Sequence, residues 1–337
     1  MRTRTTRRVM AIWFAVVLWL VVMPAVAQAD QQASFSLIAL PDTQGYSRDY
    51  PAIFAAQIEW IIDNRLYPNK ENIAFVTHLG DIVDKGNAKE WERANRIMSR
   101  LDGVVPYGMS RGNHDYGGGF QRYFPAERYK KYDWYGGGYQ NNTYDATNAN
   151  SYQLFSAGGL DFVILHLECS APDEVLEWAN GVLKQHADRR AIITTHAYHG
   201  DLGNGRKGRS PHISFWGSRG NSGEQMWQKC FSQHANVFLV LCGHISGIQA
   251  HRQTSIGVHD NEVHEILSDY KVANGWVSGY LRIYRFWPAE NRIEVQTYSP
   301  NFHRFCEGTN IVPDASEHNF ELFYDMGGAA QAKAVGQ

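Results

Sequence analysis

The chain has 337 residues and a formal net charge of −2, with 44% hydrophobic and 20% charged residues. This length is enough for one large domain or two small ones with a substantial buried core. The slightly acidic balance, without a dominant basic stripe, argues against a general nucleic-acid-binding surface.

The first 29 residues have the order of a secretory signal peptide. A basic start with Arg7 and Arg8 precedes an unbroken apolar run from Val9 to Met23, and Pro24 leads to a predicted cleavage point after Ala29. The run is short for a permanent membrane helix, and no cysteine follows it to carry a lipid. We therefore expect an exported protein, periplasmic or extracellular, without a stable membrane anchor. The paired arginines leave twin-arginine export open.

The sequence after this segment predicts one domain over residues 30–326 and a frayed tail over 327–337. Four cysteines in the domain are too few to form the framework of the fold. They are Cys169, Cys230, Cys242 and Cys306. An oxidising compartment permits one or two disulfides among them, and buried free thiols are the alternative.

Strands and helices alternate along the predicted domain. A short apolar strand at 34–40 is followed by a helix from Pro51, where Phe54, Ile58 and Ile61 recur at helical spacing, and by a buried strand from Ile73. Further helices are predicted at 88–101, 173–186 and 223–233. Further strands are predicted at 104–107, 152–155, 160–167, 191–195, 237–241, 262–267, 279–286 and 292–298. This order is typical of an α/β protein.

Two long loops interrupt this alternation. Residues 116–150 combine glycine triplets with many tyrosines, so they form either aromatic packing over the edge of the core or an aromatic-walled substrate entrance. Residues 200–222 carry four basic side chains and one acid. This second loop is either simply solvated or attracts an anionic substrate.

Metal-ligand residue types follow five of the predicted strands. They are Asp42 with Gln44, Asp81 with Asp84, Asn113 with His114 and Asp115, His196, and His244. Because α/β proteins keep their chemistry at the carboxyl ends of strands, we expect these side chains to converge. Carboxylate, amide oxygen and imidazole together suit Zn²⁺, Mn²⁺ or iron. Each motif alone has an ordinary structural explanation, so the prediction depends on the ordered set.

The ordered set resembles the calcineurin-like metallophosphoesterases. The matching motifs are Asp42-Thr43-Gln44, Gly80-Asp81-Ile82-Val83-Asp84, Gly112-Asn113-His114-Asp115, His196 and Gly243-His244-Ile245-Ser246. The chain is particularly similar to an exported bacterial branch that opens with Pro-Asp-Thr-Gln, here Pro41 to Gln44. The resemblance covers about residues 34–300. It implies a four-layer α/β/β/α sandwich of two mixed sheets.

The resemblance also implies a centre of two divalent metal ions (Mn, Zn or Fe). Asp81 would bridge the ions, Asn113, His196 and His244 would complete one site, and Asp42 with Gln44 would hold the other. The implied reaction is hydrolysis of a phosphomonoester or phosphodiester, a small phosphorylated substrate, by attack of a metal-bound hydroxide.

The same resemblance implies roles for the remaining motif residues. His114 would protonate the leaving oxygen or stabilise developing charge, and Asp115 would fix the tautomer of its ring. Arg111 would grip a phosphate oxygen, with a surface ion pair as the alternative. Asp84 is expected just outside the ligands.

Two positions depart from the family pattern, and both affect the first ion. Gln44 and Ser246 stand where the family has histidines, so we expect this ion to bind weakly or to be a harder metal such as Mn²⁺ or Mg²⁺. Three histidines are candidates to replace the missing ligands, whereas two others lie within strands and are expected to be structural. The candidates are His199, His212 and His251, and the structural pair is His78 and His166.

Two other functions stay open at this stage. The departures allow a non-catalytic binding protein on the same scaffold, with an impaired first metal site. A secreted nuclease would need a basic groove that the composition does not indicate. The sequence makes no prediction of the substrate or the oligomeric state.

Overall fold

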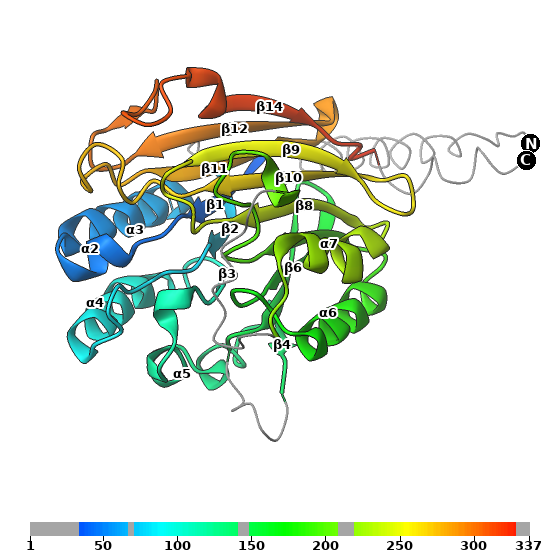
Figure 1. Ribbon diagram of the computed structural model, residues 1–337, viewed down its shortest axis with the longest axis horizontal. Coiled ribbons are helices and arrows are strands. Elements are labelled where there is room, and N and C mark those ends of the chain that lie inside the picture. The colour runs from blue at the N-terminus through cyan, green and yellow to red at the C-terminus, as the bar shows by residue number, and fades with distance from the viewer. Residues whose placement is uncertain (1–33, 67–70, 141–147, 208–218, 328–337) are drawn as a thin grey trace, which may run out of the picture.

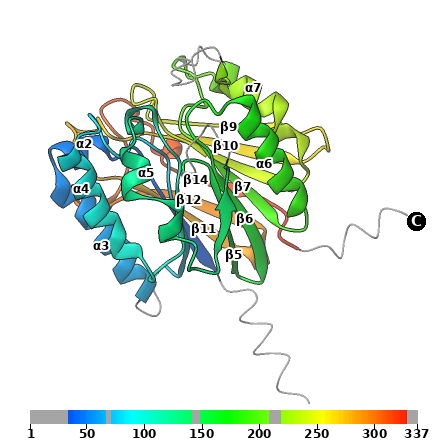
Figure 2. The same cartoon turned by 90° about the horizontal axis from the view of Figure 1, so that it is seen from below.

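The protein folds into two β-sheets that pack face to face, with helices on the outer face of each (Figures 1 and 2). The computed structural model describes residues 34–66, 71–140, 148–207 and 219–327. The predicted four-layer α/β/β/α sandwich is confirmed. The predicted signal peptide and nearly all of the predicted tail lie outside the described residues. Among the helices that the structure describes, none has the length and apolar character needed to span a bilayer.

The first sheet has seven strands, in the order β13, β12, β11, β1, β2 and β3, with β14 also paired to β12. Their bounds are β1 Phe35–Leu40, β2 Ile73–His78, β3 Tyr107–Met109, β11 Leu281–Trp287, β12 Arg292–Ser299, β13 Arg304–Phe305 and β14 Asn319–Phe323. Strands β1, β2 and β3 run parallel, so their carboxyl ends meet at one edge. The helices on this side are α2 Gln44–Arg48, α3 Pro51–Leu66, α4 Ala88–Met98 and α5 Gly119–Tyr123.

The second sheet also has seven strands, in the order β4, β5, β6, β7, β8, β10 and β9. Their bounds are β4 Tyr135–Gly138, β5 Ser151–Ala157, β6 Leu160–His166, β7 Arg190–Thr194, β8 Val237–Cys242, β9 Ala250–Ile256 and β10 Glu262–Ser268. Strands β6, β7, β8 and β10 run parallel, whereas β9 runs antiparallel to β10. Helices α6 (Asp173–Gln185) and α7 (Gly223–Lys229) cover this sheet on the outside (Figure 2).

Successive side chains of a strand point to opposite faces of its sheet, so the buried apolar residues form three clusters. In β1, Ile38 and Leu40 join the cluster under α3 and α4, whereas Leu37 and Ala39 join the cluster between the sheets. A third cluster lies between the second sheet and helices α6 and α7. Because both faces of β1 are covered, this strand is buried throughout, and Ser36 is its only polar residue.

Several predicted elements differ in extent from the structure. The third strand spans Tyr107–Met109 instead of 104–107, and the last predicted helix ends at Lys229 before a 3-10 turn at Phe231–Gln233. Strand β9 was not predicted because its sequence, AHRQTSI, is mostly polar, as befits a strand at the edge of a sheet.

The glycine- and tyrosine-rich segment contains α5 and β4, so its prediction as one long loop was wrong. In the described part, Phe120, Phe124 and Tyr129 are buried in the cluster under α4. The rings of Tyr107 and Tyr129 meet edge to face at 5.4 Å. This part of the segment therefore packs on the edge of the core. All four cysteines are buried free thiols.

Candidate metal centre

Four potential metal ligands converge where the strand ends of the two sheets meet. Asp81 follows β2 and Asn113 follows β3, whereas His196 follows β7 and His244 follows β8. The Nε2 atom of His196 lies 3.1 Å from Asp81 Oδ1, 3.2 Å from Asn113 Oδ1 and 3.2 Å from His244 Nδ1. The predicted convergence of these four side chains is therefore seen in the structure.

The ring of His196 is fixed with Nε2 facing this group of ligands. Its Nδ1 lies 2.8 Å from the carbonyl oxygen of Leu79, so Nδ1 carries the proton and donates it in a hydrogen bond. The other ring nitrogen is then the one that can offer a lone pair to a metal ion. Burial disfavours a charged ring, but the carboxylates of Asp81 and Asp42 outweigh burial and raise the pKa of His196 to about 9, so a metal ion at Nε2 must displace a proton.

The charge states of the neighbouring ligands, His244 and Asp81, also suit a bound cation. Burial and the positive charge of His196 lower the pKa of His244 to about 3, so this ring is neutral near pH 7. Burial opposes ionisation of Asp81, but His196, Lys271 and His114 together hold the pKa of its carboxyl well below the usual range. An ionised carboxylate beside a neutral imidazole is the state that binds a divalent cation.

Backbone strain places two of the ligands. Asp81 and His244 have φ angles of 52° and 79°, in the left-handed region that non-glycine residues rarely occupy. Gly80 precedes Asp81 with a φ of 98°, and a Cβ atom there would lie 2.6 Å from His196 Nδ1. The glycine before Asp81 thus allows both the turn and the close approach of the histidine.

This donor set fits a divalent transition metal. Asp81, His196 and His244 each offer a ligand atom within 4.8 Å of one another, and Asn113 adds an amide oxygen. One carboxylate oxygen, one amide oxygen and two imidazole nitrogens suit Zn²⁺, Mn²⁺ or iron. Asp81, Asn113, His196 and His244 are the residues that would hold the ion.

Asp42 and Gln44 are close by but are engaged by other groups. The Gln44 amide nitrogen donates to Asp81 Oδ2 at 2.9 Å, and its amide oxygen is buried without a hydrogen-bond partner among the described residues, so the predicted oxygen ligand stays a prediction. The Lys271 ammonium lies 3.0 Å from Asp42 Oδ2. Ser246 is half-buried.

Lys271 was missed by sequence reasoning. It follows the carboxyl end of β10, a strand parallel to β8, in the same way that the ligands follow their own strands. The signal that could have found it is Asp269, an acid directly after an apolar strand and two residues before the lysine.

His114 stands at the exposed rim of the ligand group. Its backbone amide donates to Asp81 Oδ1 at 3.0 Å, and its Nδ1 donates to the carbonyl oxygen of Asp84 at 2.6 Å. The side chain is 38% exposed, and its Nε2 lies 3.9 Å from Asp81 Oδ2. The ring can therefore meet a bound molecule with Nε2. The Asp84 carboxylate is paired with Arg48 at 2.8 Å, outside the ligands as expected.

The expected contact between Asp115 and the His114 ring is not present. Asp115 is fully buried, and its carboxylate accepts backbone N–H groups of Ile82, Val83 and Gly112 at 2.9, 3.1 and 2.8 Å. Burial and the charge of Asp81 raise its pKa to about 7. Asp115 therefore ties together the two loops that carry Asp81 and Asn113, and the Asp84 carbonyl orients the His114 ring.

Arg111 is buried, which excludes the surface ion pair and leaves its role toward a phosphate oxygen a prediction. Its side chain is only 4% exposed. It lies 3.9 Å from the buried carboxylate of Glu168, and its guanidinium stacks over the ring of Tyr116 at 3.9 Å. Through its contact with Glu168, Arg111 connects the end of the first sheet to the segment after β6.

The other predicted histidines are placed as follows. His78 and His166 are buried and each lies 2.9 Å from a threonine hydroxyl, which confirms their structural role. His199 and His251 face each other, with their Nδ1 atoms 3.3 Å apart, and His199 lies 3.8 Å from Glu265. They form a separate cluster and do not replace the missing ligands. His212 lies outside the described residues.

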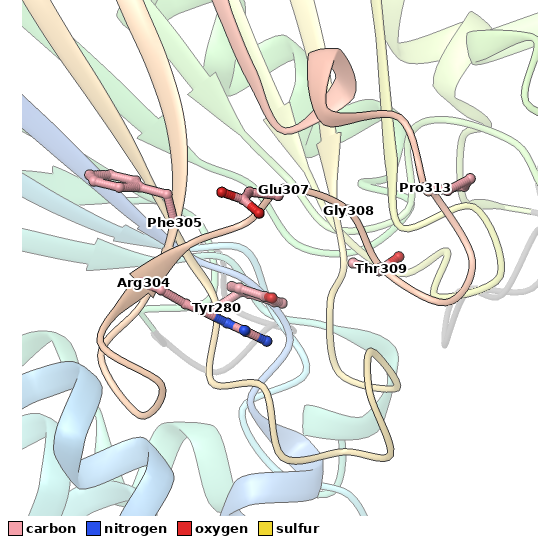
Figure 3. Close-up of a pocket in the computed structure, with 7 residues that line it drawn as sticks. All are labelled: Tyr280, Arg304, Phe305, Glu307, Gly308, Thr309 and Pro313. Carbon is pink, nitrogen blue, oxygen red and sulfur yellow. The ribbon is translucent and has the colours of Figure 1, made fainter.

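A pocket of about 700 Å³ lies beside the first sheet. Figure 3 shows the residues that line it. Tyr280, Arg304 and Thr309 are among its lining residues, and no residue of the ligand group lines it. The centroid of the Tyr280 ring lies 5.5 Å from that of the Tyr270 ring, so the pocket lies close to the residue that precedes Lys271.

The fold and the ligand group together define the class of proteins with the calcineurin-like phosphoesterase fold and a candidate metal centre at its strand ends. The family described as calcineurin-like phosphoesterase matches residues 35–272, and the chain belongs to this family. The chain is 36% identical over 280 residues to the Bacillus subtilis (strain 168) protein "Uncharacterized protein YvnB". That match covers 79% of this chain but only 20% of the relative, so the chain spans about one fifth of that protein's length.

Two solved structures are similar at low sequence identity. TT1561 of Thermus thermophilus is 10% identical with a TM-score of 0.41, covering 81% of this chain and 98% of that chain. The sulfate thiohydrolase SoxB, also of Thermus thermophilus, is 11% identical with a TM-score of 0.39, covering 75% of this chain and 43% of that chain.

Proposed function

We propose that this protein is an exported phosphoesterase that hydrolyses a small phosphomonoester or phosphodiester. The observation that carries the proposal is the convergence of Asp81, Asn113, His196 and His244 beneath the accessible ring of His114. The export part rests on the order of basic, apolar and small residues in positions 1–29, which favours a periplasmic or extracellular location.

The metal ligands and His114 have different tasks in the proposed reaction: the ligands would hold a cation, and His114 would donate a proton. A divalent cation at the ligand group supplies Lewis acidity to a phosphoryl oxygen and lowers the pKa of a bound water. His114, with its Nδ1 proton held by the Asp84 carbonyl, presents Nε2 to the leaving oxygen and can donate a proton there. Asp115 holds the loops of Asp81 and Asn113 in register for both tasks.

The test is a hydrolysis assay on the purified protein with an aryl phosphate, a bis-aryl phosphodiester and an aryl sulfate. We expect EDTA to abolish cleavage of at least one phosphate ester, and added Mn²⁺ or Zn²⁺ to restore it. The aryl sulfate serves as the control for nonspecific ester cleavage. Absence of phosphate ester cleavage with either metal would contradict the proposal.

A second candidate is a binding protein that kept the scaffold without the turnover. Two contacts favour it: Gln44 donates to Asp81, and Lys271 pairs with Asp42. Both contacts engage carboxylates that the first ion of the family centre would need. The two candidates differ in their dependence on His114. An enzyme loses turnover in His114→Asn, whereas a binding protein retains its ligand affinity and shows no His114-dependent turnover.

A further inference from the structure

Lys271 places its ammonium among three carboxylates at the edge of the metal centre. Its Nζ lies 3.0 Å from Asp42 Oδ2, 3.0 Å from Asp269 Oδ2 and 4.0 Å from Asp81 Oδ2. The side chain is only 11% exposed. The ammonium therefore occupies a position at which oxygen ligands converge.

The two oxygens of Asp81 have different partners. Oδ1 faces the nitrogen ligands, 3.1 Å from His196 Nε2. Oδ2 instead accepts the amide of Gln44 at 2.9 Å and faces the Lys271 ammonium. A carboxylate can offer a separate oxygen to each of two ions, and here the second oxygen is engaged by Gln44 and faces Lys271.

We propose that the protein binds a single divalent ion, at Asp81 Oδ1, Asn113, His196 and His244, and that the Lys271 ammonium stands in for a second cation. This inference rests on the metal centre of the proposed function. It explains three residues together: Gln44 and Ser246 supply no imidazole, and Lys271 supplies the positive charge that Asp42 and Asp81 would otherwise lack.

Charge supports this arrangement. Carboxylate oxygens of Asp42, Asp269 and Asp81 all lie within 4.0 Å of the ammonium. One divalent ion and one ammonium offset the formal charge of these three carboxylates. A second divalent ion beside the ammonium would meet a repulsion that, at about 4 Å, is worth several kcal/mol at the effective dielectric of a partly buried site.

Packing fixes the loop that carries the lysine. The backbone N–H of Gly279 donates to the Tyr46 hydroxyl at 3.0 Å, and Trp276 packs directly on α2 at Gly45, where a Cβ atom would lie 2.5 Å from the indole. The guanidinium of Arg48 lies over the same indole at 5.4 Å. The loop that follows Lys271 is therefore anchored on α2.

The experiment counts ions on the full chain. Wild type, Lys271→Ala and Lys271→Arg are equilibrated with excess Mn²⁺ and desalted, the metal is counted by elemental mass spectrometry, and Mn²⁺ coupling is read by electron paramagnetic resonance. The matched control is Lys229→Ala, which removes an exposed lysine paired with Asp173 at 2.6 Å. We expect one uncoupled ion per chain in wild type, Lys271→Arg and Lys229→Ala.

Lys271→Ala frees Asp42 and Asp269, so its stoichiometry is expected to rise from one ion towards two, with a coupled spectrum. Two coupled ions in wild type, or one ion in both wild type and Lys271→Ala, would overturn the inference. No ion in wild type would instead overturn the metal centre and the proposed function with it. If Lys271→Ala does not fold, the wild-type spectrum decides, since an uncoupled ion supports the inference and a coupled pair refutes it.

Discussion

The Nε2 atom of His196 lies 3.1 Å from Oδ1 of Asp81, and this contact joins the ends of two strands from different sheets. Neither residue is exposed, because the sandwich closes around them. The metal centre thus takes its ligands from both sheets, so a shift of either sheet would change the distances between the ligands.

His114→Asn tests the proton donor. We expect turnover of a phosphate ester to fall by about 10² to 10⁴, because that is the usual contribution of general acid–base catalysis. Metal affinity should change little, since the contact to Asp81 comes from the backbone amide, which the variant keeps. The matched control is His303→Asn, at an exposed histidine with a φ of 54° that asparagine tolerates. Equal turnover in the two variants would rule out the assigned role.

Gly112→Ala tests the close approach of the two ligand loops. A Cβ atom at this position would lie 2.2 Å from both the backbone nitrogen and Oδ1 of Asp81. The ligand must shift, and we expect Mn²⁺ affinity to fall by more than about tenfold, as for losses of supporting groups at metal sites. Titration calorimetry measures the effect. Gly181→Ala, in α6 with open space around its Cβ, should bind Mn²⁺ as wild type does.

Asp115→Ala tests whether this carboxylate is a structural tie. Removing it leaves three buried N–H groups without their acceptor, so the free energy of unfolding should fall by at least about 3 kcal/mol. Asp115→Asn keeps one oxygen for Ile82 and Val83, and its loss should be smaller. Urea denaturation gives both values. If Asp115→Ala keeps the stability of wild type but loses turnover, the structural role is wrong, and Asp115 would instead act by orienting the His114 ring.

Glu265 gives a prediction for acid stability. Burial favours its neutral form, but His199 and Arg206 lower the pKa of the Glu265 carboxyl to about 2. Because the unfolded carboxyl titrates near about pH 4.3, the ionised form stabilises the fold, by about 3 kcal/mol above about pH 5. This contribution is lost as the pH falls through about 2.

The measurement is the difference in unfolding free energy between wild type and Glu265→Gln at several pH values. The difference should be largest near pH 7 and shrink below pH 5. Glu290→Gln, at a glutamate whose side chain is 53% exposed, should differ from wild type by less than about 0.5 kcal/mol at every pH. A difference for Glu265→Gln that does not change with pH would show that its pKa is not depressed.

The convergence of Asp81, Asn113, His196 and His244 could be predicted because each residue directly follows a buried strand, and parallel strands end at one edge. Lys271 was not predicted, because a lysine is not a metal ligand and the only local signal for it was Asp269, two residues earlier. The burial of Arg111 beside Glu168 could not be predicted for a related reason: Glu168 lies in the other half of the sandwich, and nothing local in the sequence connects the two residues.

The most direct test of the metal centre is anomalous diffraction from crystals of the protein grown with Mn²⁺. We expect a strong peak within about 2.2 Å of Asp81 Oδ1, His196 Nε2 and His244 Nδ1. A metal-loaded crystal without a peak among these three atoms would contradict the account.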